Sequence, residues 1–210
     1  ESRTGVITRA MGLDFAVLHA AIKRFPVNAS QHSPIELLDK LIKENSIKPE
    51  EVKKIEVGVN EGVILHSGTI VEPNEVIEAQ FSLRFSLALR LLRGSNELKF
   101  YLDPHVWHDR AILAMGRKIG LFADPTAVKE RRFACRMKIA LLNGNVVEGA
   151  LPSPKGNFSN PLSKQEITAK FLANASSVLP REKLDQIVEK IERVEIEEDM
   201  SSFAALLSAQ

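Results

Sequence analysis

Residues 133–147 read Phe133-Ala134-Cys135-Arg136-Met137-Lys138-Ile139-Ala140-Leu141-Leu142-Asn143-Gly144-Asn145-Val146-Val147. Up to Leu141, apolar side chains alternate with polar or small ones, which is the period of a strand with one buried face. Asn143-Gly144 then supplies a left-handed turn, and Val146 begins a returning strand. The stretch predicts an antiparallel hairpin, the clearest strand pair in the chain.

Strand and helix patterns also precede this hairpin. Residues 54–59, Lys-Ile-Glu-Val-Gly-Val, alternate in the same way and predict another half-buried strand. Residues 33–36, Ser-Pro-Ile-Glu, are typical of a helix start with Ser33 as the N-cap, and Lys48-Pro49 should end that helix. The segment from Phe81 to Leu92 is apolar nearly all round, so we expect a helix covered on most sides and closed by Gly94.

These helices and strands do not alternate regularly as βαβ units, and the strongest strand pair is a hairpin. The sequence therefore predicts an α+β fold with a mostly antiparallel sheet packed with helices.

The chain changes character after Leu151. Residues 152–161 are rich in proline, glycine and asparagine and predict a long loop. Ser163 and Glu166 form a capping box at the start of one helix, and Pro180 begins another. We therefore predict an α+β domain over residues 1–158 and an all-helical C-terminal segment over residues 159–210.

Composition limits the classes of function. The chain has 210 residues, 44% hydrophobic and 26% charged, which is typical of a globular protein. Its net charge of +1 gives no electrostatic reason to expect a nucleic acid or a membrane as partner. A single cysteine, Cys135, cannot form an internal disulfide, so a cytoplasmic setting is the default expectation. No apolar stretch approaches the roughly 20 residues that cross a bilayer.

Common catalytic motifs do not occur in the sequence. It has no glycine-rich phosphate loop, no Gly-x-Ser-x-Gly elbow and no zinc-binding His-Glu-x-x-His. His105 and His108 flank Trp107 without a third ligand, so we predict a solvent-facing or capping pair around a core tryptophan and no metal site. His19 and His66 have no partner in the sequence and are expected to be ordinary surface or half-buried residues. The basic run at residues 129–132, continued by Arg136 and Lys138, is expected to be a solvated strand face.

Residues 21–32, Ala-Ile-Lys-Arg-Phe-Pro-Val-Asn-Ala-Ser-Gln-His, lack any periodicity. Lys23 and His32 are separated by a turn with a proline and lead into the start of the helix predicted at Ser33. Backbone N–H groups at a helix start favour a carboxylate, to which both side chains could add direct contacts. The alternative is that Lys23 is a surface residue and His32 satisfies the backbone near the cap.

The same segment resembles the Lys-x-[Tyr/Phe]-Pro…His segment of the MmgE/PrpD family. Three further stretches agree in order and spacing, so that the resemblance covers almost the whole chain. They are residues 78–83, residues 154–163 with Pro154-Lys155-Gly156-Asn157 and Asn160-Pro161-Leu162-Ser163, and residues 170–175.

This resemblance implies an enzyme with a helical N-terminal domain, absent here, and an α+β domain whose chain finally returns as helices to pack on the helical one. Family members are dehydratases, decarboxylases and epimerases of small di- or tricarboxylates such as 2-methylcitrate. They use no metal or organic cofactor and are commonly dimers, so we expect a homodimer. The chain opens on Glu1 without an initiator methionine, and we expect it to be the second part of a longer protein, inactive alone.

The resemblance also implies site residues. Lys23 is assigned to catalysis or carboxylate binding, because the reaction handles a proton at a carbon next to a carboxylate or carbonyl, and a fixed ammonium offsets the developing negative charge. His32 is expected to orient the substrate or the loop. Asn28 stands where the family's cis-aconitate decarboxylases have a pocket-forming histidine, and Ile64 stands about where they have a tyrosine. Both departures argue against decarboxylation of cis-aconitate.

Weaker candidates complete the predicted substrate site. They are Asn28 and Ser30 in the turn, Gln80 and Ser82, and Lys155 in the loop. Internal hydrogen bonding is an equal alternative for Gln80 and Ser82, and solvation is the alternative for Lys155. The competing function is a non-catalytic carboxylate-binding or interaction domain that retains the family fold.

Overall fold

The computed structural model describes residues 11–13, 15–127 and 133–207. The chain divides into two compact units, Glu1–Pro161 and Leu162–Gln210. This division falls in the loop predicted over residues 152–161, three residues after the predicted boundary.

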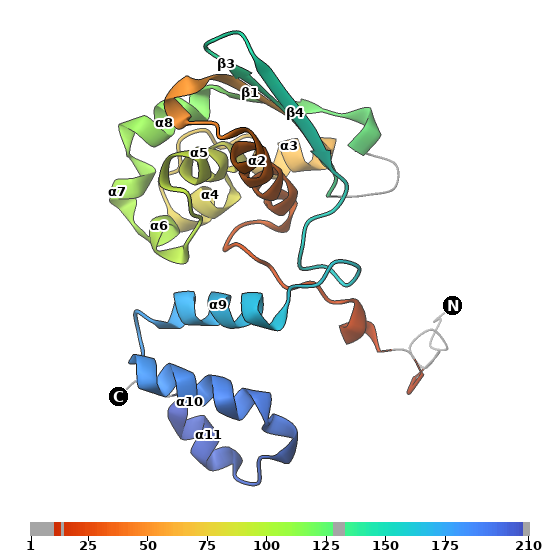
Figure 1. Cartoon of the computed structure of the whole chain (residues 1–210), viewed down its shortest axis with the longest axis vertical. Helices are drawn as coiled ribbons and strands as arrows, with labels where there is room; N and C mark the ends of the chain where they lie inside the picture. Colours follow the sequence, from red (N-terminus) through yellow and green to blue (C-terminus); the bar gives the residue numbers. More distant parts are fainter. Residues whose placement is uncertain (1–10, 14, 128–132, 208–210) are drawn as a thin grey trace, which may run out of the picture. The chain divides into compact units, whose positions relative to one another are not determined.

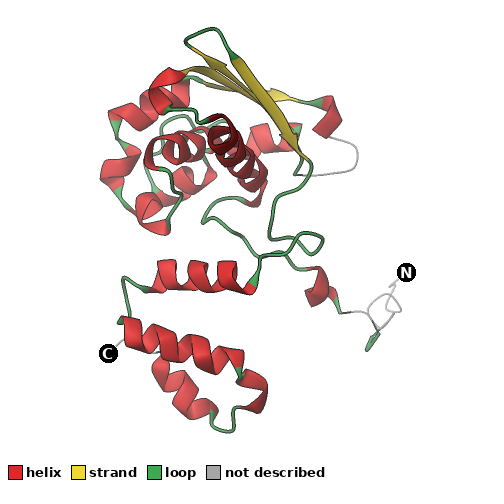
Figure 2. Cartoon of the chain, viewed as in Figure 1, coloured by secondary structure: helices red, strands yellow, loops and turns green. Residues whose placement is uncertain are grey.

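The first unit is built on a sheet of four strands in the order β2-β1-β3-β4 (Figure 2). The strands are β1 (Val52–Val59), β2 (Ile119–Ala123), β3 (Cys135–Leu141) and β4 (Val146–Leu151). β1 runs parallel to β2 and antiparallel to β3, and β3 runs antiparallel to β4. The prediction of a mostly antiparallel α+β fold is confirmed, although β2 and its parallel pairing were not foreseen.

The hairpin predicted over residues 133–147 is present as β3 and β4. Cys135, Met137, Ile139 and Leu141 are buried, whereas Arg136 and Lys138 are exposed. The intervening loop has glycine in the left-handed conformation, with φ of 88° at residue 144.

Helices cover one face of this sheet, as Figure 1 shows. α2 (His32–Asn45) packs against β3 and β4, α5 (Leu83–Arg93) packs on α2, and α8 (Arg110–Arg117) packs on α5. The hydrophobic core lies between these helices and the inner face of the sheet. Shorter helices complete the unit: α3 (Glu61–Ser67), α4 (Val76–Phe81), α6 (Leu98–Leu102) and α7 (Pro104–Trp107).

The helix predicted after Ser33 is present, but its predicted cap is wrong. α2 begins at His32 with Gln31 as its N-cap, and Ser33 is fully buried within the first turn. A 3-10 turn, η2 (Ala29–Gln31), leads directly into the helix and is capped by the Asn28 side chain. The helix therefore starts earlier than the local capping pattern suggested. It also ends at Asn45, before the predicted Lys48-Pro49 stop.

The apolar segment from Phe81 to Leu92 is divided between two helices. Phe81 ends α4, and Ser82 is the N-cap of α5. The rest of the prediction is confirmed, because α5 is buried over most of its length and Gly94 closes it in the left-handed conformation.

The second unit is helical, with α9 (Lys164–Ala175), α10 (Arg181–Glu192) and α11 (Met200–Leu206). The predicted capping box is confirmed: the Glu166 backbone N–H donates to Ser163 Oγ, and the Ser163 N–H donates to a Glu166 carboxylate oxygen. Pro180 is the N-cap of α10, as expected. Among the described residues, every helix is too short or too polar to cross a lipid bilayer.

Candidate functional site

The turn that carries the predicted site is anchored by two buried apolar side chains, Phe25 and Val27. Lys23 precedes them and is exposed. The backbone N–H of Ile22 donates to the carbonyl of Gly156 at 2.8 Å, which joins this segment to the proline-rich loop. The turn is therefore fixed by packing on one side and by the loop on the other.

A pocket of about 680 Å³ lies beside this turn. The turn contributes Lys23, Asn28, Ala29 and Ser30, so three predicted site residues meet in one cavity. The other lining residues come from the start and body of α3 and from Phe133, two residues before β3. They are Asn60, Gly62, Val63, His66 and Phe133.

Two asparagines hold the walls of this pocket in place. Asn28 Oδ1 accepts hydrogen bonds from the backbone N–H and the hydroxyl of Ser30, at 3.0 and 2.8 Å. Asn60 Oδ1 accepts from the backbone N–H of Gly62 at 2.8 Å and caps α3. The hydroxyls of Ser30 and Ser67 lie 3.3 Å apart and connect the two walls.

These bonds determine what the pocket can offer a ligand. Because the Oδ1 atoms of Asn28 and Asn60 accept the capping bonds, each asparagine has its Nδ2 amide left as the donor. Lys23 adds an ammonium and His66 an imidazole. The described lining residues include no carboxylate; Glu61, next to Asn60, is exposed and lies outside the lining. A cluster of donors without a competing acid favours an anionic ligand.

His32 lies outside the lining of this pocket. It is buried, with 4% of its surface exposed, and its ring lies 5.5 Å from the Phe25 ring. It therefore packs behind the turn, which fits the predicted role in orienting the loop better than a direct contact with substrate.

Three of the five weaker candidates, Gln80, Ser82 and Lys155, also lie outside the lining, whereas Asn28 and Ser30 belong to it. Ser82 is fully buried, donates its hydroxyl to the Ile70 carbonyl at 2.7 Å and accepts from the Phe85 N–H. Gln80 bonds to the backbone of the turn and not to the cavity. The Lys155 backbone N–H donates to the Glu36 carboxylate at 2.9 Å. For Ser82 and Gln80, these contacts favour the internal hydrogen bonding that the sequence left open.

Two lining residues with polar side chains, His66 and Asn60, were missed from the sequence. His66 was expected to be an ordinary surface residue, and it is exposed but faces the cavity. No sequence signal connects it to Lys23. Asn60 could have been identified, since asparagine before a short apolar run is a common N-cap.

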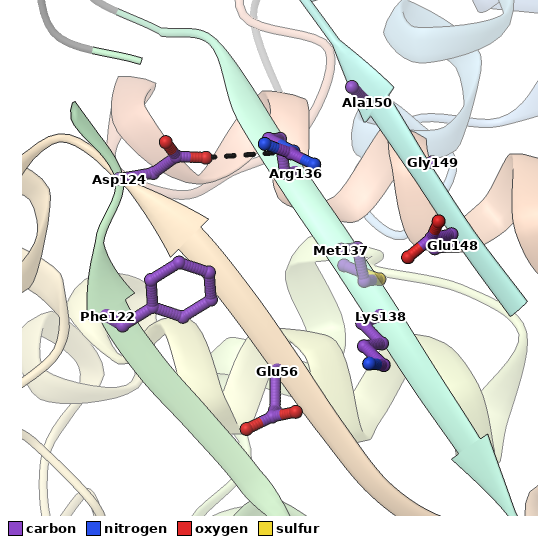
Figure 3. Close-up of a pocket in the computed structure, with 9 residues that line it drawn as sticks. All are labelled: Glu56, Phe122, Asp124, Arg136, Met137, Lys138, Glu148, Gly149 and Ala150. Carbon is purple, nitrogen blue, oxygen red and sulfur yellow. Dashed lines mark ion pairs between the residues drawn. The ribbon is translucent and has the colours of Figure 1, made fainter. Parts of the chain in front are cut away.

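A second pocket, of about 750 Å³, lies on the outer face of the sheet (Figure 3). Its charges are mixed, and Figure 3 shows Asp124 directed toward Arg136, with 3.9 Å between Oδ2 and Nε. A hydrogen bond from the Thr126 hydroxyl lowers the pKa of Asp124, so this acid keeps its charge. The face as a whole presents Glu56, Asp124 and Glu148 against Arg136 and Lys138. Acidic groups make it a poorer site for a polyanion than the pocket at Lys23.

The remaining sequence candidates behave as ordinary residues. His105 and His108 are exposed and flank the buried Trp107, as predicted. In the described part of the chain, no three histidine, cysteine, aspartate or glutamate side chains gather as metal ligands. Arg136 and Lys138 are exposed on the outer face of β3, whereas residues 129–132 lie outside the described part.

These observations define the class of protein: an α+β domain with a pocket that is lined by hydrogen-bond donors and lies beside a turn that carries a lysine. The chain belongs to the MmgE/PrpD family, because the family's C-terminal domain matches residues 25–197. The match begins just after Lys23, so the assignment of that residue rests on the neighbouring segment.

Two relatives are similar to this chain. The cis-aconitate decarboxylase-like protein oryM of Aspergillus oryzae is 25% identical, over 97% of this chain and 44% of its own length. The cis-aconitate decarboxylase of Mus musculus is 32% identical, over 64% of this chain and 28% of its own length. The chain thus spans less than half the length of these relatives.

Proposed function

We propose that this chain forms one wall of the active site of a cofactor-independent lyase or isomerase that acts on small di- or tricarboxylates, such as 2-methylcitrate. The observation that supports this most is the pocket in which Lys23, Asn28 and His66 meet, with no carboxylate among the lining residues that the structure describes. Family membership supports the lyase or isomerase class.

The pocket supplies the electrostatic part of such a reaction. Lys23 and the Asn28 amide donate hydrogen bonds to a substrate carboxylate. When a proton leaves the neighbouring carbon, negative charge spreads onto that carboxylate and strengthens both interactions. The group that takes the proton comes from elsewhere in the complete protein, as does the helical domain that the family resemblance implies. Homodimer formation likewise stays a prediction.

Two positions bear on the choice of substrate and reaction, residues 28 and 64. Asn28 lines the pocket where the family's cis-aconitate decarboxylases have a histidine, and an amide cannot transfer a proton as an imidazole can. Ile64 packs against the core and is absent from the pocket lining. Both features favour dehydration or epimerisation of a polycarboxylate over decarboxylation of cis-aconitate.

The test uses the complete gene product that contains these residues. 2-Methylcitrate, citrate and cis-aconitate are incubated with it in deuterated water, and exchange and product formation are followed by NMR. Lys23→Ala should lower the rate by about 100-fold or more, as is usual when a group that stabilises a transition-state charge is removed. The matched control is Lys53→Ala, an exposed lysine outside the pocket, which should retain the full rate.

Each outcome has a definite meaning. Unchanged turnover in Lys23→Ala removes this residue from the mechanism. Binding of polycarboxylates without exchange or product in the complete protein supports the non-catalytic alternative. We expect residues 1–210 alone to show no turnover, and detectable turnover contradicts a shared active site.

A further inference from the structure

Gln80 makes three hydrogen bonds to the turn that forms the pocket wall. It lies at the end of α4 and is partly buried. Its side-chain Nε2 donates to the Pro26 carbonyl at 2.9 Å. Its backbone carbonyl accepts from the Asn28 N–H at 3.0 Å and from Gln31 Nε2 at 2.9 Å. One residue of α4 thus contacts the turn at three points.

These contact points bracket the consecutive lining residues 28–30, while Lys23 lines the pocket from a position before Pro26. Pro26 lies two residues before this stretch, Asn28 is its first residue, and Gln31 follows its last residue, Ser30. Gln31 is fully buried, so the Gln80 carbonyl satisfies a donor that water cannot reach. Gln80 therefore fixes both ends of the segment whose middle faces the cavity.

The side chain of Gln80 contributes a bond that few residues could replace. Residue 26 of the turn is a proline, whose backbone has a carbonyl but no N–H. A side chain can therefore hydrogen-bond to the backbone of this residue only as a donor. The amide of Gln80 supplies this donor from an element 54 residues away in sequence. Loss of the donor leaves the Pro26 carbonyl without this partner and frees the turn to move.

We propose that Gln80 is a positioning residue: it holds the turn Pro26–Gln31 so that Asn28 and Ser30 face a bound polycarboxylate. The inference rests on the proposed function of the pocket and gives Gln80 a role that does not require contact with the ligand. Its effect on binding passes through Asn28, which makes the two residues energetically coupled.

The first measurement compares Gln80→Met with a matched control. Methionine has a similar length but no donor, so it removes the bond to Pro26. Lys118→Met removes a bond of the same kind, from Lys118 Nζ to the Val52 carbonyl at 2.8 Å, outside the pocket. In calorimetric titrations of the complete gene product with citrate, Gln80→Met should raise Kd about 10-fold, and Lys118→Met should leave it unchanged.

The second measurement separates positioning from general destabilisation. Asn28→Asp keeps a capping oxygen but replaces the amide donor with a carboxylate that repels citrate, so it should raise Kd strongly. If Gln80 positions Asn28, Asn28→Asp in the Gln80→Met background should raise Kd by a factor at least 3-fold smaller than it does in the unmodified protein. If the factors by which the two substitutions raise Kd simply multiply in the double variant, the proposal is overturned. This holds even if Gln80→Met lowers the thermal stability.

The outcomes distinguish this proposal from the proposed function. If Lys23→Ala and Asn28→Asp both leave citrate binding intact, the pocket is not the polycarboxylate site and the proposed function fails. If those two weaken binding but Gln80→Met does not, only the positioning role is overturned. Should Gln80→Met not fold, Gln80→Glu, which keeps the shape and lacks the donor toward Pro26, is measured in its place with the same expected result.

Discussion

At the scale of single residues, the proposed site assigns each of two asparagines both a structural hydrogen bond and a contact with the ligand. Asn28 caps the 3-10 turn η2 and Asn60 caps the helix α3 through their side-chain oxygens, so their amide nitrogens are the groups left for a ligand. The caps fix the direction of these donors without further contacts, because an amide is planar. The anion preference that we propose for this pocket follows from local hydrogen bonding as much as from the charge of Lys23.

The single cysteine gives a test of the core at the same scale. Cys135 is 2% exposed, and burial raises its pKa to about 12. The native protein at pH 8 should therefore react with an aromatic disulfide reagent only as fast as it unfolds, because the thiolate is the nucleophile. In 6 M guanidinium the reaction should be complete within seconds.

An exposed cysteine provides the control for that measurement. Ser159→Cys introduces a thiol at an exposed loop position and should add one rapidly reacting equivalent to the native protein. Rapid, stoichiometric reaction of the unmodified native chain contradicts the burial of Cys135.

Local sequence patterns predicted some of the residues in the candidate site and not others, and the difference has physical reasons. Lys23, Asn28 and Ser30 lie within eight residues, so proximity in sequence brought them together. His66 comes from another element, and only the tertiary packing of α3 beside the turn places it there. Ser33 has the residue type of a cap, but burial of Gln31 and His32 extends the helix backward past it.

At the scale of elements, α2 and α5 are joined by an ion pair as well as by apolar packing. Arg90 donates to Asp39 Oδ1 through Nη2 and Nε, at 2.6 and 3.2 Å. Both side chains are largely buried, with 12% and 18% exposed. Burial by itself would raise the pKa of Asp39, but hydrogen bonds from Lys43 and Arg90 outweigh it and hold the pKa below its usual 3.8.

We expect Asp39→Ala to lower the free energy of unfolding by about 1–3 kcal/mol at pH 7, because it leaves Arg90 without its charged partner. Since the folded pKa lies below the unfolded one, this contribution is present above about pH 4 and is lost as the pH falls through the folded value. Urea titrations at several pH values should show the two proteins converging in acid.

The control for the ion pair lies on the same helix. Glu44→Ala removes an exposed pair with Lys40, whose charged atoms lie 3.9 Å apart, and should change stability by less than about 0.5 kcal/mol. An equal loss in both variants contradicts the role of the Asp39–Arg90 pair.

Sequence periodicity predicted the elements whose burial is regular. β3 alternates strictly, so its partner and its buried face could both be foreseen. β2 has a glycine and no alternation, and its place in the sheet depends on pairing with β1 across more than 50 residues. Such a strand is specified by tertiary contacts and not by local pattern.

At the scale of the whole molecule, the hydrophobic core is unevenly shared between the two units. The continuous core cluster draws its residues from 25 to 141, all in the first unit. In the helices described for the second unit, Leu184 and Ile187 are the residues that become buried. A helical unit of roughly 50 residues with so small a core is marginal by itself.

Separate expression of the units should expose this difference. Residues 1–161 should unfold in urea in one cooperative transition, followed by circular dichroism, because they keep the whole core cluster. Residues 162–210 should show a weak helical signal that falls gradually with increasing urea, since short helices with little packed surface are unstable in water. A sharp transition in the second unit alone, or none in the first, contradicts the assignment of the core.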